Sequence, residues 1–151
     1  MLKYSLILAT IGRSIEVERF LASLDRQTYR SFELIVVDQN DDDRVSSMLE
    51  SYRDNFEIIY LKSKPGLSIA RNRGLQEVSG DIVAFPDDDC WYPPNLLEAI
   101  TQIFSRYDID IVTGQSRDEE NRHSQRFWSS KPSVADVISV WKLAISYTVF
   151  I

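Results

Sequence analysis

Residues 80–89, with the sequence GDIVAFPDDD, join an apolar run to three consecutive aspartates. The run at 82–85 has the continuous apolar character of a buried strand, and Pro86 stops it. The aspartates at 87–89 follow at the end of that strand, where three carboxylates repel one another and are incompletely hydrated. We therefore expect a cation at this turn, and oxygen ligands favour a hard divalent ion such as Mg²⁺ or Mn²⁺. A solvated acidic turn is the simpler alternative.

Working outward from this stretch, strands and amphipathic helices alternate along the chain. Strands are predicted at 2–9, 32–38, 56–61, 81–85, 109–112 and 144–151, with helices after Ser14, at 44–52, at 67–78 and after Pro93. The strand at 32–38 is apolar almost throughout, which is typical of a strand buried on both faces of a parallel sheet. The alternation predicts an α/β fold with a doubly wound, mostly parallel sheet flanked by helices. Its ligand loops should lie at the carboxyl ends of the strands.

The helix predicted at 67–78 carries a charged residue within its apolar side. Its expected buried face consists of Leu67, Ala70, Gly74, Leu75 and Val78. Arg71 falls in the middle of that face, and a guanidinium cannot be buried there without a partner. We expect Arg71 to point into a polar site beside the sheet, because the next strand delivers the aspartates nearby.

Composition narrows the possible classes of protein. The 151 residues are 44% hydrophobic, enough for the core of a single domain. Lysine and arginine number 17 against 23 acidic residues, and the net charge of −6 argues against nucleic acid as a partner. The single cysteine, Cys90, cannot form an internal disulfide and is interpreted as a packing residue in a reducing compartment. No apolar run is long enough to span a membrane, so we expect a cytoplasmic protein.

Five motifs follow one another along the chain, namely ATIGR at 9–13, SLDRQTY at 23–29, FELIVVDQN at 32–40, GLSIARNRG at 66–74 and GDIVAFPDDD at 80–89. In this order they resemble the nucleotide-sugar half of the family 2 glycosyltransferases, an inverting group with the GT-A fold. The likeness is close over about residues 4–105 and looser beyond them. The expected fold is therefore GT-A, a Rossmann-like doubly wound sheet.

The resemblance also implies roles for single residues around the donor. Thr10 and Arg13 would lie beside the nucleotide, and Asp38 would accept a hydrogen bond from the base, typically uracil. Arg71 would reach the nucleotide or its phosphates.

The aspartates would be the DxD motif of this family, holding Mn²⁺ or Mg²⁺ on the diphosphate. Asp87 and Asp89 are the implied metal ligands, while Asp87 and Asp88 also face the nucleotide. A diphosphate and an acidic turn repel each other until a divalent cation bridges them, so the physical argument agrees with the resemblance.

By the same resemblance the partners are a nucleotide-diphosphate sugar, UDP- or dTDP-linked, and a saccharide or lipid-linked acceptor. The setting would be polysaccharide assembly, with peripheral association at the inner face of the membrane. Inverting transfer needs a carboxylate as general base. The acidic residues that follow the aspartate turn are better interpreted as solvated charges than as this base; they are Asp118, Glu119, Glu120 and Asp136. We therefore expect residues 1–151 to form a single domain that is truncated before the acceptor-binding half. The catalytic general base would then lie beyond Ile151. An open sheet edge at 144–151 would favour pairing between chains.

Three other classes of protein compete with this interpretation. A nucleotidyltransferase shares the acidic metal ligands but needs a glycine-rich basic loop after the first strand, and residues 10–14 are poor in glycine. A dinucleotide dehydrogenase is disfavoured because no G-x-G-x-x-G follows that strand. A non-catalytic module that binds nucleotide sugar or metal stays open.

Overall fold

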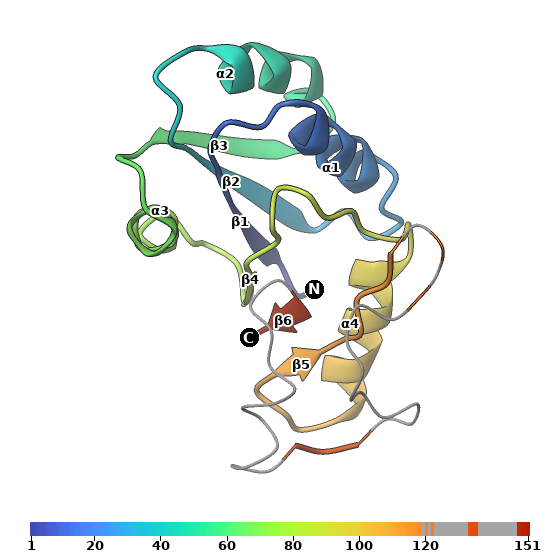
Figure 1. Cartoon of the computed structure of the whole chain (residues 1–151). Coiled ribbons are helices and arrows are strands. Elements are labelled where there is room, and N and C mark those ends of the chain that lie inside the picture. Colours follow the sequence, from blue (N-terminus) through green and yellow to red (C-terminus); the bar gives the residue numbers. More distant parts are fainter. Residues whose placement is uncertain (119, 121, 123–132, 136–147) are drawn as a thin grey trace.

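The computed structural model describes residues 1–118, 120, 122, 133–135 and 148–151 (Figure 1). Within these residues the chain forms one six-stranded sheet with the strand order β3-β2-β1-β4-β6-β5. The strands are β1 Tyr4–Thr10, β2 Phe32–Asp38, β3 Glu57–Lys62, β4 Ile82–Ala84, β5 Val112–Thr113 and β6 Val149–Phe150. The strands β1 to β4 run parallel, whereas β6 is antiparallel to both of its neighbours. The expectation of a mostly parallel sheet is confirmed.

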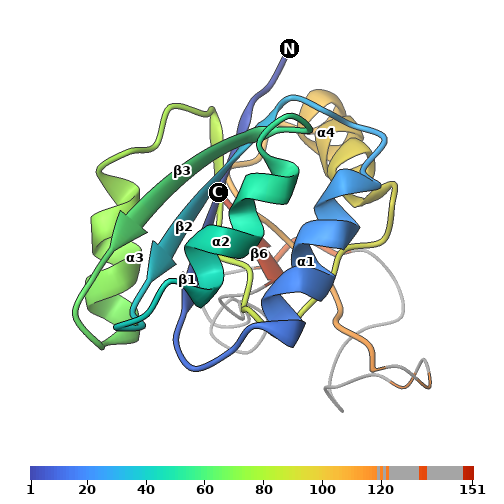
Figure 2. The same ribbon diagram turned by 90° about the horizontal axis from the view of Figure 1, so that it is seen from above.

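Helices cover both faces of this sheet (Figures 1 and 2). They are α1 Ile15–Asp25, α2 Arg44–Leu49 with a short 3₁₀ turn at Glu50–Tyr52, α3 Leu67–Leu75 and α4 Leu96–Arg106. Helices α1, α2 and α4 contribute to one apolar cluster, and α3 packs against the opposite face. The sheet is therefore buried on both faces around β1 and β2.

Alternation along β1 explains how one strand serves two cores. Leu6 and Leu8 point to the larger cluster, where Phe20 of α1 is fully buried. Ile7 points to the other face and belongs to the smaller cluster with Ala70 of α3. Both faces demand apolar side chains, so the continuous apolar runs of β1 and β2 are what the packing requires.

Helix α3 packs through a narrower face than its sequence pattern predicts. Ala70 and Gly74 are buried, but Leu67 and Leu75 are 52% and 44% exposed, so their expected burial is wrong. A Cβ added at Gly74 would lie 2.5 Å from Cγ2 of Ile7. The small residues let the helix approach the sheet closely, and at that distance the larger leucines lie to the side of the contact.

The sheet edge beyond β4 also differs from the expectation. The strand predicted at 109–112 is observed as β5 at Val112–Thr113, because pairing occurs only where β6 offers Val149 and Phe150 as partners. Of the strand predicted at 144–151, β6 covers two residues, and positions 144–147 lie outside the described residues.

A buried carboxylate lies near the amino-terminal ends of the central strands, at Glu33. Glu33 of β2 is fully buried and accepts hydrogen bonds from Lys3 Nζ at 2.7 Å, Ser5 Oγ at 2.6 Å and both Ser79 donors. Burial alone would raise its pKa, but these hydrogen bonds outweigh burial and lower the pKa to about 2. This cluster ties β1, β2 and the entry to β4 together.

Candidate functional site

Four loops meet at the carboxyl edge of the parallel strands, because those strands all end at the same side of the sheet. The loop after β4 is joined to β1 by a parallel bridge between Ala9 and Asp87. The loop after β2 is joined to β1 by the Gln39 backbone N–H, which donates to the Thr10 carbonyl at 3.0 Å. Segments far apart in the sequence thus form one surface.

A pocket of about 350 Å³ opens between these loops. Its lining consists of Ala9, Ile11, Arg13, Gln39, Gly66, Leu67, Asp87, Asp88 and Asp89. The structure therefore brings Arg13 and all three aspartates to one cavity, as the motifs predict. The lining combines apolar residues with three carboxylates, which suits a ligand that has an apolar part and a charged part.

Arg13 and Thr10 organise the acidic side. Thr10 lies behind the pocket, almost fully buried, and donates its hydroxyl to Asp88 Oδ2 at 2.7 Å. Nη1 of Arg13 lies 2.9 Å from Asp88 Oδ1 and 2.7 Å from Asp89 Oδ2. The hydrogen bond with Asp89 and the charge of Asp88 raise the pKa of Arg13. One guanidinium nitrogen therefore contacts two carboxylates and offsets one of their two negative charges.

Arg71 pairs with the remaining aspartate from the other side. Its Nη2 donates to Asp87 Oδ1 at 3.0 Å, which confirms that the arginine of α3 points toward the acidic turn. Burial raises the pKa of Asp87, the Arg71 charge opposes this rise, and Asp89 and Asp88 add to it. The Nε of Arg71 is buried and has no hydrogen-bond partner among the described residues.

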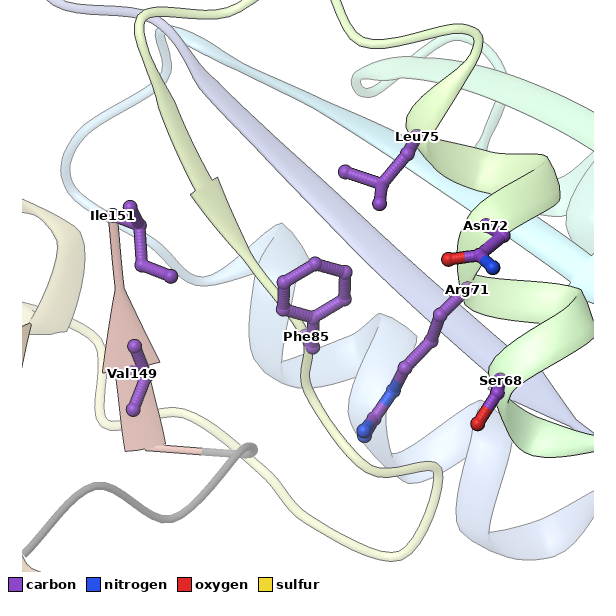
Figure 3. Close-up of a pocket in the computed structure, with 7 residues that line it drawn as sticks. All are labelled: Ser68, Arg71, Asn72, Leu75, Phe85, Val149 and Ile151. Carbon is purple, nitrogen blue, oxygen red and sulfur yellow. The ribbon is translucent and has the colours of Figure 1, made fainter. Parts of the chain in front are cut away.

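Arg71 also lines a second pocket, of about 420 Å³ (Figure 3). Its lining comes from α3, the end of β4 and β6, namely Ser68, Arg71, Asn72, Leu75, Phe85, Val149 and Ile151. The Arg71 guanidinium carbon lies 5.5 Å from the centre of the Phe85 ring, within reach of a cation–π contact. Arg71 thus contacts Asp87 of the acidic pocket and also lines this second, largely apolar pocket.

The three aspartates of the turn differ in how many of their carboxylate oxygens accept hydrogen bonds from the protein. Both Asp88 oxygens accept hydrogen bonds, from Thr10 and Arg13. Asp87 uses only Oδ1, and Oδ1 of Asp89 has only a weak contact of 3.9 Å with the Cys90 thiol. Within the described part of the turn, Asp87 and Asp89 therefore each keep one oxygen without a strong hydrogen bond, and their role as metal ligands stays a prediction.

The described residues contain no group of three or more acidic, histidine or cysteine side chains arranged to hold a metal ion. The donor set nevertheless fits Mn²⁺ or Mg²⁺ that is shared with a ligand. Mg²⁺ is commonly held by one or two carboxylates together with substrate phosphates, and all the donors here are oxygens. Asp87 and Asp89 line the pocket, and each has one oxygen without a strong hydrogen bond, so they match that arrangement.

Asp38 lies at the end of β2, and protein donors engage both of its carboxylate oxygens. Its side chain is fully buried, and Oδ1 accepts from the Asn40 backbone and side chain at 2.9 and 2.7 Å. Oδ2 accepts from Tyr60 at 2.7 Å and from Lys62 at 2.9 Å. Burial opposes ionisation, but these donors lower the pKa of Asp38. Asp38 shapes the loop after β2, and its contact with a base stays a prediction.

Gln39, the next residue, lines the pocket and was not predicted from the sequence. Its side-chain Nε2 donates to the Thr10 carbonyl at 3.3 Å, and its Oε1 accepts from the Gly66 N–H at 2.7 Å. Asn40 adds a further link by accepting from the Gly12 N–H at 2.6 Å. The available signal was the place of Gln39 directly after a buried strand, where the carboxyl-edge loop begins.

The remaining acidic and thiol candidates have structural contacts. Asp118 and Glu120 both pair with Arg122, in keeping with solvated charge, whereas Glu119 and Asp136 lie outside the described residues. Burial, followed by the charges of Asp89 and Asp87, raises the pKa of Cys90 to about 11, so this thiol has no thiolate character at neutral pH. No helix among the described residues is long and apolar enough to cross a membrane.

Comparison with solved structures defines the class of fold. TarS of S. aureus, residues 1–349, superposes with a TM-score of 0.84 at 22% identity, over 98% of this chain and 46% of TarS. Its complex with UDP-GlcNAc gives 0.78 at 20% identity, over 98% of this chain and 44% of TarS. The mannosyltransferase PcManGT of Pyrobaculum calidifontis, solved with GDP-Man and Mn²⁺, gives 0.67 at 20% identity, over 80% of this chain and 37% of PcManGT. The fold is that of the GT-A glycosyltransferases.

Sequence comparison gives the family. The model of glycosyl transferase family 2 matches residues 5–148, and the chain belongs to that family. One curated relative, the glycosyltransferase GlyA of Streptococcus pneumoniae serotype 4, is 31% identical over 100 residues, which are 65% of this chain and 14% of GlyA. The chain spans less than half the length of the first curated relatives that it matches.

Proposed function

We propose that the protein transfers a sugar from a nucleotide-diphosphate donor to an acceptor hydroxyl with inversion, assisted by a divalent metal ion. One observation carries this proposal. The turn at 87–89 and the guanidinium groups of Arg13 and Arg71 converge beside a pocket at the carboxyl ends of β1, β2 and β4. That combination of acidic and basic groups suits a diphosphate held through a cation.

The pocket suggests a place for each part of the donor. Ile11 and Leu67 line the pocket and are half exposed, and a nucleobase would contact them. Gln39 lies beside them with a side-chain amide, which both donates and accepts hydrogen bonds. The diphosphate would lie toward Arg13 and Arg71, with the sugar beyond Asp89.

Asp87 and Asp89 would hold the metal ion together with the diphosphate oxygens. When bound, the ion supplies charge neutralisation for the departing nucleoside diphosphate. Arg13 and Arg71 would add positive charge on either side of the same group, and Thr10 would keep Asp88 oriented. The acceptor hydroxyl would attack the anomeric carbon in one displacement, assisted by a carboxylate general base.

The donor and the setting rest on similarity. TarS binds UDP-GlcNAc and PcManGT binds GDP-Man with Mn²⁺, and these complexes support a nucleotide-sugar donor and a divalent ion. We retain a UDP- or dTDP-linked sugar as the donor and a saccharide or lipid-linked hydroxyl as the acceptor. Work at the cytoplasmic face of a membrane stays part of the same proposal.

A second candidate is a module that binds nucleotide sugar without transferring it. It is favoured by one observation, since Asp118 and Glu120 are engaged by Arg122 and no general base is evident among the described residues. Family membership favours transfer over nucleotidyl transfer and over dehydrogenation.

The first experiment is a thermal-shift panel of UDP, dTDP, GDP and CDP, each with Mn²⁺ and with EDTA. A nucleotide at a hundred times its dissociation constant adds about 2.7 kcal/mol of stability. We expect one nucleotide to raise the melting temperature with Mn²⁺ and to lose most of that effect in EDTA. Equal melting temperatures across the whole panel would overturn the donor site.

A second experiment separates the enzyme from the binding module. The sugar form of the stabilising nucleotide is incubated with the protein and Mn²⁺, and release of free nucleoside diphosphate is followed with time. Release that depends on protein and metal supports transfer or slow donor hydrolysis. Binding without release supports the module.

A further inference from the structure

Arg13 occupies the acidic turn in a way that affects metal binding. Its Nη1 lies 2.9 Å from Asp88 Oδ1 and 2.7 Å from Asp89 Oδ2, so a positive charge already sits between these carboxylates. A divalent ion on Asp89 would lie directly beside this guanidinium, and like charges at such separations repel strongly. Arg13 and a metal ion therefore compete for Asp89, the carboxylate that both would contact.

The two arginines of the site differ in their freedom to move. Arg71 extends from α3, is 17% exposed and lies over the Phe85 ring (Figure 3). Arg13 lies in the loop after β1 and is 40% exposed. The residue before it, Gly12, has a φ of +73°, and no atom lies within 4 Å of the place that a Cβ would take there. Exposed ion pairs contribute little net stability, so the pair with Asp89, which is 52% exposed, is easily broken, whereas Asp88 is a more buried partner.

We infer that Arg13 is an exchangeable internal counter-ion, which holds Asp88 and Asp89 in the donor-free protein and moves to the diphosphate when donor and metal bind together. This inference rests on the proposed function. It specifies how the binding of the metal ion and the binding of the donor are coupled. The ion alone must displace Arg13 without offering it a new anion, whereas the ion with a nucleoside diphosphate provides one. Metal and nucleotide should therefore each strengthen the binding of the other by the same factor.

The test measures Mn²⁺ alone, without nucleotide, by electron paramagnetic resonance of the free ion during a titration of the 151-residue chain. Arg13→Gln should bind Mn²⁺ at least threefold more tightly than the unchanged protein. Arg13→Lys keeps the charge but cannot reproduce the planar contact, so its affinity should fall between those two. Arg53→Gln removes an equal charge from an exposed pair with Glu50 and should bind as the unchanged protein does.

Two outcomes of this titration would overturn the inference. An affinity of Arg13→Gln equal to or weaker than that of the unchanged protein would mean that the guanidinium does not compete with the ion. Tighter binding by Arg13→Gln with no change in Arg13→Lys would mean that net charge alone is responsible, without exchange. Thermal unfolding in EDTA checks that each variant is folded.

A second titration adds a saturating nucleoside diphosphate from the thermal-shift panel. In the unchanged protein the nucleotide should tighten Mn²⁺ binding strongly. In Arg13→Gln this enhancement should fall at least threefold, because no internal cation has to be relocated. An undiminished enhancement contradicts the exchange. If no nucleotide binds to any variant, the proposed function fails, and the titration with Mn²⁺ alone still decides whether Arg13 competes with the ion.

Discussion

At the scale of single residues, the carboxylates of this chain divide by how completely they are engaged. Glu33 and Asp38 are fully buried, and each accepts four hydrogen bonds, so they serve as anchors for the backbone. Asp87 and Asp89 keep oxygens with weak contacts or none among the described residues. This difference in engagement is why we propose Asp87 and Asp89, and neither Glu33 nor Asp38, as metal ligands.

The first prediction concerns Asp89. Asp89→Ala removes one of the two half-engaged carboxylates and should weaken Mn²⁺-dependent nucleotide binding by at least tenfold in isothermal titration. The melting temperature without ligand should change little, since the side chain is 52% exposed. Asp54→Ala, an exposed change at the other end of the sheet, is the matched control. Nucleotide binding that keeps both its strength and its metal dependence in Asp89→Ala would show that the ligand assignment is wrong.

The second prediction concerns Glu33, at the end of the sheet remote from the pocket. Glu33→Gln leaves Lys3 and the serine donors without their anion and should cost about 2–4 kcal/mol of unfolding free energy in urea. Because the folded pKa of Glu33 is lowered to about 2, its contribution is present above the ordinary pKa of 4.5. That contribution is lost as the pH falls from about 4.5 toward 2. The variant should therefore show a flatter loss of stability over this window, and parallel curves would contradict the prediction.

At the scale of elements, α3 connects packing to the site. Its small residues allow close contact with β1, and this contact places Arg71 within reach of Asp87. The N-terminus of the same helix follows Gly66, whose N–H is held by Gln39. These contacts therefore fix the position of α3, the position of the loop before it and the orientation of the Arg71 side chain.

The third prediction tests this contact. Gly74→Ala should destabilise the protein by about 1–2 kcal/mol, because the new Cβ meets Ile7 at 2.5 Å and the clash exceeds the gain in helix propensity. Gly114→Ala, where the added Cβ meets nothing within 4 Å, should change stability by less than about 0.5 kcal/mol in the same urea titration. A stabilised Gly74→Ala protein would mean that α3 does not pack closely on the sheet.

At the scale of the whole molecule, the sheet has a firmly held centre and weaker edges. The strands β1 and β2 pair over seven residues and are buried on both faces. The edge strand β3 is largely half exposed, and β5 pairs with β6 over only two residues. The acidic pocket lies at the carboxyl ends of these central strands, which suits a site that must hold several groups in register.

The fourth prediction follows from this gradient. In hydrogen–deuterium exchange followed by mass spectrometry, peptides covering β1 and β2 should exchange slowest, and those covering β5 and β6 much faster. Nucleotide with Mn²⁺ should add protection to the loops around Arg13 and Asp87 and leave α4 unchanged. Equal protection of β5 and β1 would contradict the described sheet.

Much of this arrangement could be predicted from particular residues. The apolar runs of β1, β2 and β4 identified the strands, because a strand covered by helices on both sides must be apolar throughout. The position of the aspartates directly after β4 placed them at the carboxyl edge. The exposure of Leu67 and Leu75 and the short β5 were not predictable, because they depend on how closely α3 and β6 approach.

The sequence by itself determined the order of strands and helices, the edge of the sheet at which the acidic turn lies and the family to which the chain belongs. Only the tertiary structure decided which carboxylates are engaged. It buried Asp38 under Tyr60 and Lys62, turned Gln39 into the pocket and set Arg13 between Asp88 and Asp89. The physical reason is that strand patterns are local along the chain, whereas hydrogen-bond partners come from segments that meet only after folding.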